Sequence, residues 1–337
     1  MALTIYDISQ KAGVSIATVS RVLNGNDNVK ASTREKVLKV IEENDYTPNA
    51  FARGMGLGSM RTVGILCAYS SDLFLAKAVY YLEQELQAHG YESLLCCTGY
   101  NQDSKKNYLD LILSKKVDSI ILVVSNFIAE AEAENQYIMD ASTQVPIMLL
   151  NAAFDYPNVY STLCDDQAAV NDATASLINS GVKDVIYLYD SYSYSGNKKL
   201  KGFKAALKEN GINDPDSKVF YFNGNLEDLS SVVEFIEKIA KKNRFRGVVT
   251  SCDALAVGAV KYAAKKGLSI PDDLSIIGYN DSIMTTCCTP ELTSIDNKLE
   301  TQTHQLIQTL LGVLNKQEMP TRSVFSGNLV KRGTTKF

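Results

Sequence analysis

Apolar runs alternate along residues 62–285 with segments in which apolar residues recur every three or four positions. Runs such as VGILCAY, VDSIILVVS and VPIMLLNA contain no regular polar positions and predict strands that are buried on both faces. The intervening segments predict helices over 73–88, 103–115, 129–142, 166–179, 197–210, 227–242 and 254–266. The alternation predicts an α/β protein with two doubly wound parallel sheets, each in its own lobe. Ligands of such folds bind at the carboxyl ends of the strands, here in the cleft between the lobes.

Residues 4–24 have only helical periodicity and predict two short helices joined by a tight turn, the arrangement of a helix-turn-helix. Thr4 and Asp7 have the spacing of a capping box, and Gly13 supplies the left-handed residue of the turn. Ser15 caps the second helix, and Ser32 begins a third. An ordinary helical hairpin is the alternative for this segment.

Charge and composition add to this picture. Residues 1–61 carry a net charge of +2 and the remainder −6, as expected where only the N-terminal part meets phosphates. No apolar run approaches the roughly 20 residues of a membrane span, and MALTIYDISQ lacks the pattern of a secretion signal. The seven cysteines have no CxxC spacing, which is typical of a reducing compartment. We therefore expect a cytoplasmic protein with no membrane partner.

Glycine, histidine and cysteine patterns are the other candidates for chemistry in this sequence. The glycines of GMGLGS at 54–59 resemble a phosphate-binding loop, but a strand follows them where a nucleotide site needs one to precede. His89 and His304 are far apart, and Cys96 and Cys97 lack the spacing of zinc ligands. We expect no cofactor and no metal, and no catalytic constellation supports an enzyme on this fold.

The segments ATVSRVLNG, STREKV and YTPNAFARG, taken together, resemble the headpiece of the LacI/GalR family of bacterial transcription regulators, and its catabolite-control members most of all. The resemblance continues more weakly to the C-terminus. It implies an all-α helix-turn-helix headpiece over 1–47, a hinge helix and linker over 48–61, and a periplasmic-binding-protein-like core over 62–337. In the core the chain crosses between lobes three times. Lobe 1 is then expected over about 62–161 and 293–322, and lobe 2 over about 162–292 and 323–337.

The same resemblance, with the chemistry of the major groove, predicts the DNA contacts. Arg21 is expected to contact a guanine, while Ile16 and Ala17 occupy the positions by which family members differ in operator choice. Met55 falls at the position of the minor-groove wedge. The predicted DNA-binding residues are Thr4, Tyr6, Ser15, Ile16, Ala17, Thr18, Ser20, Arg21, Asn24, Asn49, Ala50, Arg53 and Met55. Two headpieces on a pseudo-palindromic operator require a homodimer.

The expected effector site departs from the family pattern at two positions. Sugar-binding members have an arginine where this chain has Lys199, and an aspartate where it has Asn280. A point charge and a neutral amide replace the bidentate grip on a diol, which favours a sugar phosphate over a free sugar. The predicted effector residues are Phe74, Tyr100, Asp165, Tyr192, Lys199, Asp253 and Asn280. Asp165 and Asp253 could instead only cap helices.

These observations predict a sequence-specific DNA-binding regulator, expected to repress carbohydrate genes under the control of a small metabolite, a sugar or sugar phosphate. The alternative is a catabolite-control regulator that answers to a phosphocarrier protein. Those relatives carry arginines after the last long strand, where this chain reads SIMTTCCTPEL. A transport-type sugar-binding protein is a further alternative, opposed by the headpiece.

Overall fold

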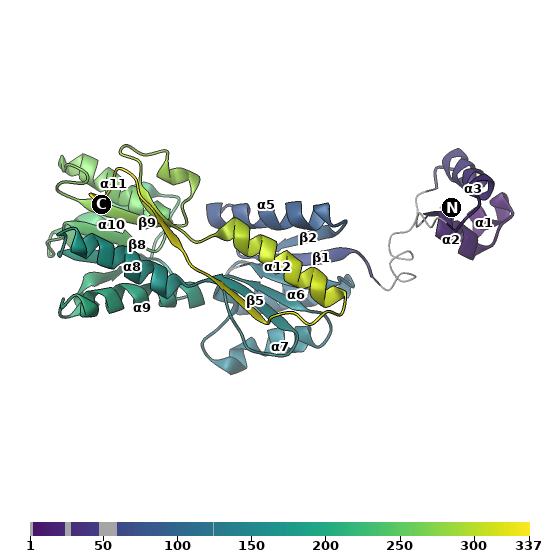
Figure 1. Ribbon diagram of the computed structural model, residues 1–337, viewed down its shortest axis with the longest axis horizontal. Helices are drawn as coiled ribbons and strands as arrows, with labels where there is room; N and C mark the ends of the chain where they lie inside the picture. The colour runs from purple at the N-terminus through teal and green to yellow at the C-terminus, as the bar shows by residue number, and fades with distance from the viewer. Residues whose placement is uncertain (1–2, 24–27, 47–58, 124) are drawn as a thin grey trace. The chain divides into compact units, whose positions relative to one another are not determined.

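The computed structural model describes residues 3–23, 28–46, 59–123 and 125–337. The chain forms two compact units, a small N-terminal one and a large one that begins at Val63 (Figure 1). The small unit, called the headpiece below, contains α1 (Ile5–Ala12), α2 (Ile16–Leu23) and α3 (Ala31–Glu43). The large unit, called the core, holds two sheets and their helices. Each unit is described by itself.

Local hydrogen bonds fix the turn between α1 and α2. The Asp7 carboxylate accepts hydrogen bonds from the Thr4 N–H and hydroxyl, both at 2.7 Å, which lower the pKa of Asp7. Gly13 ends α1 in the left-handed conformation (φ 60°, ψ 38°), a region that favours glycine because it has no Cβ. The Ser15 hydroxyl accepts from the Thr18 N–H at 3.2 Å. The predicted helix-turn-helix is therefore confirmed.

An apolar core joins the three headpiece helices. Its buried members come from every helix and from the segment after α3, namely Ile8, Ala12, Val19, Val22, Val37 and Tyr46. The cap of α3 expected at Ser32 is wrong by two residues, because Lys30 occupies the cap position: its carbonyl accepts from the Thr33 and Arg34 N–H groups, and α3 begins at Ala31.

Two six-stranded sheets form the centres of the two lobes. Lobe 1 has the strand order β11-β5-β4-β3-β1-β2, and lobe 2 the order β12-β10-β9-β8-β6-β7. The strands of lobe 1 are β1 (Thr62–Cys67), β2 (Glu92–Cys97), β3 (Ser119–Val123), β4 (Ile147–Leu150), β5 (Val159–Cys164) and β11 (Arg322–Phe325). Those of lobe 2 are β6 (Val185–Tyr189), β7 (Val219–Tyr221), β8 (Gly247–Thr250), β9 (Ser275–Tyr279), β10 (Thr293–Asp296) and β12 (Asn328–Val330). The inner strands pair in parallel, whereas β12 runs antiparallel to β10.

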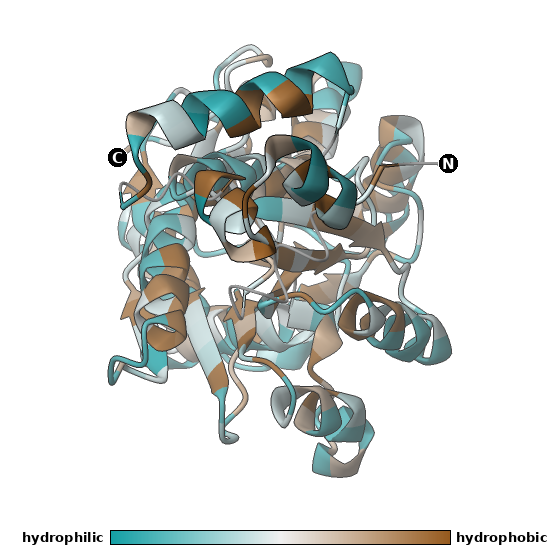
Figure 2. Cartoon of the chain, turned by 90° about the vertical axis from the view of Figure 1, so that its right-hand side faces the viewer, coloured by the Kyte–Doolittle hydropathy of each residue, from teal (hydrophilic) through white to brown (hydrophobic). Residues whose placement is uncertain are grey.

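Helices cover both sheets, and their buried apolar residues share clusters with those of the strands; Figure 2 shows apolar and polar residues alternating along the helices. Lobe 1 carries α5 (Leu73–Ala88), α6 (Gln102–Ser114), α7 (Gln136–Ser142) and α12 (Leu299–Leu314). Lobe 2 carries α8 (Asp166–Asn179), α9 (Tyr194–Glu209), α10 (Leu229–Ala240) and α11 (Asp253–Lys266). Helices α5 and α12 lie side by side, and Leu82, Leu306 and Leu310 share one buried cluster. No helix among the described residues is long and apolar enough to cross a membrane.

Two predicted helices begin three or more residues away from their predicted starts. The helix expected over 129–142 is α-helical only from Gln136, after a 3₁₀ turn at Glu132–Asn135. The Asn135 side chain there bonds the N–H and carbonyl of Ala129 at 2.8 and 3.0 Å, which holds the preceding segment as a loop. Helix α9 begins three residues before the predicted 197, because the Ser193 hydroxyl caps it by accepting from the Gly196 N–H.

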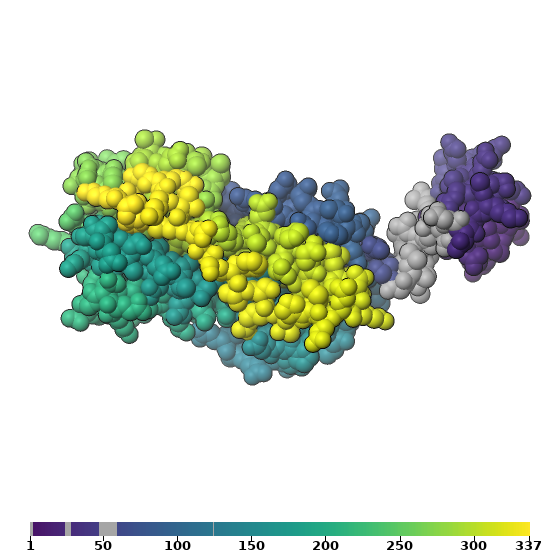
Figure 3. Space-filling model, viewed as in Figure 1, coloured from purple at the N-terminus to yellow at the C-terminus, as the bar shows by residue number. Residues whose placement is uncertain are grey.

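The crossings between lobes lie beyond the expected positions near 161, 293 and 322. Strand β5 continues to Cys164 in lobe 1, and β10 pairs with β9 in lobe 2. Strand β11 pairs with β5, so residues up to Phe325 belong to lobe 1. The chain therefore changes lobe only after these three strands end, because the residues of each strand are hydrogen-bonded within one sheet. Figure 3 shows the C-terminal stretch, in yellow, on both lobes.

Candidate nucleic-acid interface and inter-lobe cavity

Helix α2 turns one side to the headpiece core and the other to solvent. Val19 and Val22 are buried, whereas Ile16, Ala17 and Arg21 are exposed. Of the other predicted DNA contacts, Thr4, Tyr6 and Ser15 are exposed and Thr18 and Ser20 half-buried. The predicted contacts Asn24, Asn49, Ala50, Arg53 and Met55 lie outside the described residues.

The exposed side of α2 combines short polar groups with one cation. The Ser15 and Thr18 hydroxyls bond each other at 2.9 Å at its first turn, and Arg21 lies in its last turn. The Lys11 ammonium donates to the Asn44 side chain and so ties the end of α1 to the end of α3. Small hydroxyl and methyl groups with a guanidinium suit a helix that reads base edges in a major groove.

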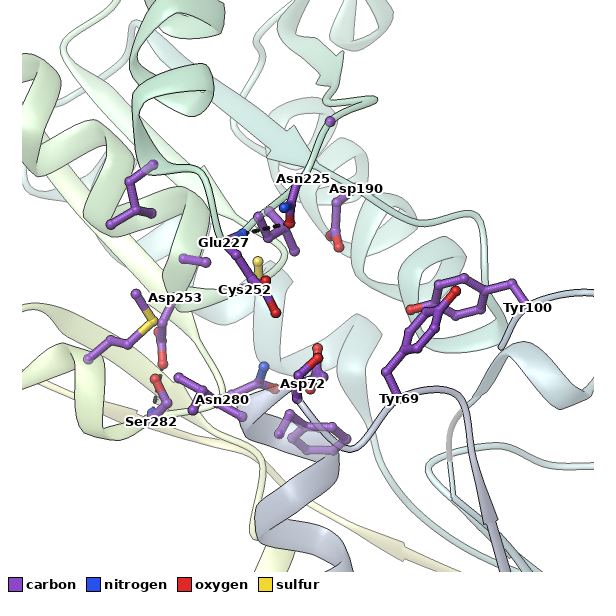
Figure 4. A pocket seen from close by; sticks show the side chains of 18 residues that line it. Tyr69, Asp72, Tyr100, Asp190, Asn225, Glu227, Cys252, Asp253, Asn280 and Ser282 are labelled. Atoms are coloured by element: carbon purple, nitrogen blue, oxygen red, sulfur yellow. Dashed lines mark hydrogen bonds between the residues drawn. The ribbon is translucent and has the colours of Figure 1, made fainter. Parts of the chain in front are cut away.

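A cavity of about 420 Å³ lies between the two lobes of the core, at the carboxyl ends of the strands (Figure 4). Lobe 1 lines it with Tyr69, Ser71, Asp72, Leu73, Phe74 and Tyr100. Lobe 2 lines it with Asp190, Gly224, Asn225, Leu226, Glu227, Leu229, Cys252, Asp253, Ala254, Asn280, Ser282 and Met284. Of the predicted effector residues, Phe74, Tyr100, Asp253 and Asn280 are among them.

The cavity wall is acidic. Asp72, Asp190, Glu227 and Asp253 contribute carboxylates, and none of the described residues that line the cavity is Lys, Arg or His. Asp72 also caps α5 by accepting from the Leu75 N–H at 2.9 Å, and Asp190 accepts from the Ser251 hydroxyl at 2.5 Å. These fixed acceptors attract hydroxyl donors and repel anions.

Asp253 is the most deeply buried of the four carboxylates. It is the first residue of α11, only 2% exposed, and accepts from the Ser282 N–H at 2.7 Å and the Ser294 hydroxyl at 2.6 Å. Burial raises the pKa of Asp253 to about 6 despite these bonds. Its two oxygens therefore hold the loop after β9 and strand β10 against α11, besides facing the cavity.

Asn280 follows β9 in the left-handed region (φ 98°), where asparagine is among the best-tolerated residues. Its N–H donates to the Ile295 carbonyl at 2.9 Å, and its side-chain oxygen accepts from the Asn297 amide at 3.3 Å. The residue presents a neutral amide to the cavity, as its sequence position predicts.

Lys199 does not line the cavity, contrary to the sequence-based expectation. Its ammonium donates to the Ser251 carbonyl at 3.1 Å and lies 3.8 Å from the centroid of the Tyr279 ring, inside lobe 2. The buried Asp166 carboxylate accepts from the hydroxyls of Ser195 and Tyr279; burial raises the pKa of Asp166, and the nearby charge of Lys199 opposes that rise. Lys199 therefore supplies no cation to the lining of this cavity for a phosphate to bind.

Two further predicted effector residues lie outside the cavity lining. Asp165 accepts from the Ala168 N–H at 3.1 Å as the cap of α8, the plain structural alternative. Tyr192 packs with Tyr189 and Tyr221, with ring centroids 5.5 and 4.7 Å apart. Asp165 follows the carboxyl end of β5 and Tyr192 that of β6, as predicted. Their side chains, however, cap a helix and pack on other tyrosines instead of lining the cavity.

The sequence prediction missed three carboxylates and one amide of the cavity: Asp72, Asp190, Glu227 and Asn225. The positions of these residues after predicted strands could have indicated them. Asp190 directly follows β6, and Asn225 and Glu227 follow β7, so each lies at the carboxyl end of a strand, where ligands of such sheets bind. Asp72 lies after β1 at the start of α5.

Comparisons with known proteins agree with this architecture. Residues 4–49 match the family of bacterial regulatory proteins, lacI family, and residues 174–335 match a periplasmic binding protein-like domain. An HTH-type transcriptional regulator of Lachnoclostridium phytofermentans is 50% identical over 335 residues, which are 99% of this chain and 100% of that protein. Catabolite control protein A of Priestia megaterium is 35% identical over 88% of this chain and 87% of its own length.

A solved structure of the lac repressor dimer, bound to operator and the anti-inducer ONPF, superposes with a TM-score of 0.86 at 22% identity, over 99% of both chains. That likeness concerns the fold. The headpiece and the two-lobed core are those of a DNA-binding transcriptional regulator rather than an enzyme. The chain belongs to the LacI family of such regulators.

Proposed function

We propose that this regulator represses carbohydrate genes in the cytoplasm, as a homodimer on a pseudo-palindromic operator, and that a neutral saccharide in the inter-lobe cavity controls its DNA affinity. One observation carries the choice of ligand: the cavity has four carboxylates and aromatic rings, and no cation among its described lining residues.

Each group in the cavity suits a hydroxyl-rich ligand. Carboxylate oxygens of Asp72, Asp190 and Glu227 accept hydrogen bonds from hydroxyls, and charged acceptors form the stronger bonds. The rings of Phe74 and Tyr100 offer flat surfaces to the apolar faces of a sugar ring. A phosphate would bring at least one negative charge among these carboxylates without a counter-ion, so the free sugar is favoured over its phosphate.

A ligand in this cavity contacts both lobes at once. Asp72 belongs to lobe 1 and Asp190 and Glu227 to lobe 2, so a bound saccharide stabilises the arrangement in which the two sets of acceptors face each other. A ligand shifts a conformational equilibrium only by its difference in affinity for the two states. Contacts that bridge the two lobes provide that difference in affinity. The resulting shift in lobe arrangement then changes the affinity of the dimer for DNA.

The homodimer is supported by an uncovered apolar face on lobe 1. Strand β2 lies at the end of its sheet, and Leu94 and Leu95, which point to opposite faces of the strand, are 37% and 42% exposed. Tyr108 and Leu111 on α6 add exposed apolar groups. Sheet edges and contiguous apolar patches of this kind are typical of protein interfaces. We propose that a second copy of the chain covers this face.

The test starts with DNA. The purified protein captures genomic fragments, the bound fragments are sequenced, and operator affinity is measured with saccharides, with their phosphates and with a serine-phosphorylated phosphocarrier protein. We expect one free saccharide to change operator affinity severalfold at a concentration at which its phosphate has no effect. An effect of the phosphocarrier protein alone would favour the alternative of catabolite control.

Matched variants place the response in the cavity. Glu227→Gln is expected to raise the saccharide concentration needed for the response about tenfold, because it removes a charged acceptor that lines the cavity. Glu234→Gln makes the same change at an exposed position on α10 and is expected to respond as the unmodified protein does. Equal responses of both variants would contradict the proposed site.

A further inference from the structure

Two exposed tyrosines pack against a buried third in lobe 2. Tyr189, Tyr192 and Tyr221 are called the tyrosine shelf here. The rings of Tyr192 and Tyr221 lie 4.7 Å apart at 33°, and Tyr189 meets Tyr192 edge-on at 5.5 Å. Tyr192 is 59% exposed and Tyr221 37%, so much of their ring area faces solvent. Rings that pack on one another and leave their outer area in water can bind a flat apolar surface.

Two shelf residues lie close along the chain to residues of the cavity wall. Tyr192 comes two residues after Asp190, and Tyr221 three residues before Gly224, and both of these neighbours line the cavity. The shelf also lies at the boundary with lobe 1. The Asn197 amide donates to the Tyr192 carbonyl at 3.0 Å and to the Glu130 carboxylate of lobe 1 at 2.8 Å.

Lobe 1 contributes a second pair of tyrosines at the cavity. Tyr69 and Tyr100 meet edge-on with ring centroids 5.2 Å apart, and both line the cavity (Figure 4). The pKa of Tyr100 is raised to about 12 by burial and then by the charges of Asp72 and Asp190. Tyr100 therefore lies close to Asp190 of lobe 2, the residue from which the chain continues to the shelf.

We infer that the effector is an oligosaccharide, with one sugar unit in the cavity and the next on the tyrosine shelf. This inference rests on the proposed saccharide control. The carboxylates of the cavity bind the hydroxyls of the first unit, and the shelf has no charged side chain of its own. Its rings instead pack against the apolar face of the next sugar, and the Tyr189 and Tyr192 hydroxyls, 3.3 Å apart, serve its hydroxyls.

The test compares chain lengths with one sugar type. Isothermal titration uses glucose, cellobiose and cellotriose, then the xylose and mannose series with the same β-1,4 linkage. In the series that binds, the disaccharide is expected to bind at least about tenfold more tightly than the monosaccharide, about 1.4 kcal/mol. The trisaccharide is expected to add little, because the shelf holds one unit.

Variants assign the gain to the shelf. Tyr192→Ala is expected to lower disaccharide affinity about tenfold without changing monosaccharide affinity, and Tyr192→Phe, which keeps the ring, is expected to restore most of the loss. Tyr156→Ala removes a tyrosine stacked on Phe154 outside the cavity lining and is the matched control. The chain has no tryptophan, so Tyr192→Trp adds a single fluorophore whose emission should change with the disaccharide and not with the monosaccharide.

The outcomes separate this inference from the proposed function. If a monosaccharide binds as tightly as its disaccharide, or if the gain survives in the Tyr192→Ala/Tyr221→Ala double variant, the shelf is not part of the site, while saccharide control stands. If no saccharide of any length binds, both the inference and the proposed ligand class are wrong. Thermal unfolding of each variant checks that lobe 2 remains folded.

Discussion

The Lys199 ammonium lies 3.8 Å from the centroid of the Tyr279 ring, at the distance of a close cation–π contact. Lys199 comes from α9 and Tyr279 from β9, and the same ammonium donates to the Ser251 carbonyl after β8. A single cation thus joins three elements of lobe 2. Because Lys199 is 8% exposed and its ammonium contacts the Ser251 carbonyl and the Tyr279 ring, its role is structural.

Removing this cation should destabilise lobe 2. Lys199→Met removes the hydrogen bond to the Ser251 carbonyl and the contact with the Tyr279 ring and takes a positive charge away from the buried Asp166, which is expected to lower the free energy of unfolding by about 1–3 kcal/mol. Urea unfolding followed by circular dichroism measures the loss. The double variant Lys199→Met/Asp166→Asn should regain the part of it that comes from the Asp166 charge. A loss below about 1 kcal/mol in the single variant would contradict the structural role.

The pH dependence of the free energy of unfolding should reveal the raised pKa of Asp253. Its pKa is about 6 in the folded protein and 3.8 is its ordinary value, so the folded state binds more protons between these limits. Stability from this group is therefore present below about pH 4 and is lost as the pH rises through 6, by about 3 kcal/mol.

Asp253→Asn removes this titration while retaining one acceptor oxygen. The difference in free energy of unfolding between the unmodified protein and the variant should shift by about 3 kcal/mol, against the unmodified protein, from pH 4 to pH 7. Denaturant titrations at four pH values measure it. Parallel curves for the two proteins would mean that Asp253 ionises normally in the folded state.

Arg21 should determine sequence preference at one base pair. Its side chain is exposed in the last turn of α2, and a bidentate bond to guanine discriminates against the wrong base by about 1–3 kcal/mol. Arg21→Ala should weaken binding to the operator by that amount. On operators mutated at that base pair, the variant should bind as tightly as the unmodified protein does. Gel shifts with single-base operator variants and with random DNA at one salt concentration measure both effects. An equal loss on operator and random DNA would show a phosphate contact only.

Gly202 should be intolerant of alanine although it lies inside a helix. Alanine in place of glycine usually stabilises a helix interior by about 1 kcal/mol. Here a Cβ would lie 2.2 Å from the Gln167 carbonyl oxygen of α8, so α8 and α9 would have to move apart. Gly202→Ala should therefore lower the free energy of unfolding by about 1–3 kcal/mol. Lys201→Ala, at the exposed neighbouring position, is the control and should change stability by less than about 0.5 kcal/mol.

The sequence by itself determined the features that depend on neighbouring residues. The turn at Gly13, the cap at Thr4 and the apolar side of α2 follow from contacts within a few positions, so spacing alone predicts them. The buried strands and most helices of the core follow for the same reason. Family resemblance then supplied the three crossings and the DNA-reading positions.

Only the tertiary structure decided where long-range contacts place a side chain. Lys199 has the chain position of an effector ligand, but its ammonium contacts the Ser251 carbonyl and the Tyr279 ring inside lobe 2. The assignment of β10 and β11 to opposite sheets depends on pairing between distant segments. The acidic character of the cavity arises because loops from both lobes bring carboxylates together. No local pattern encodes that proximity, since it exists only once the two sheets have formed and face each other.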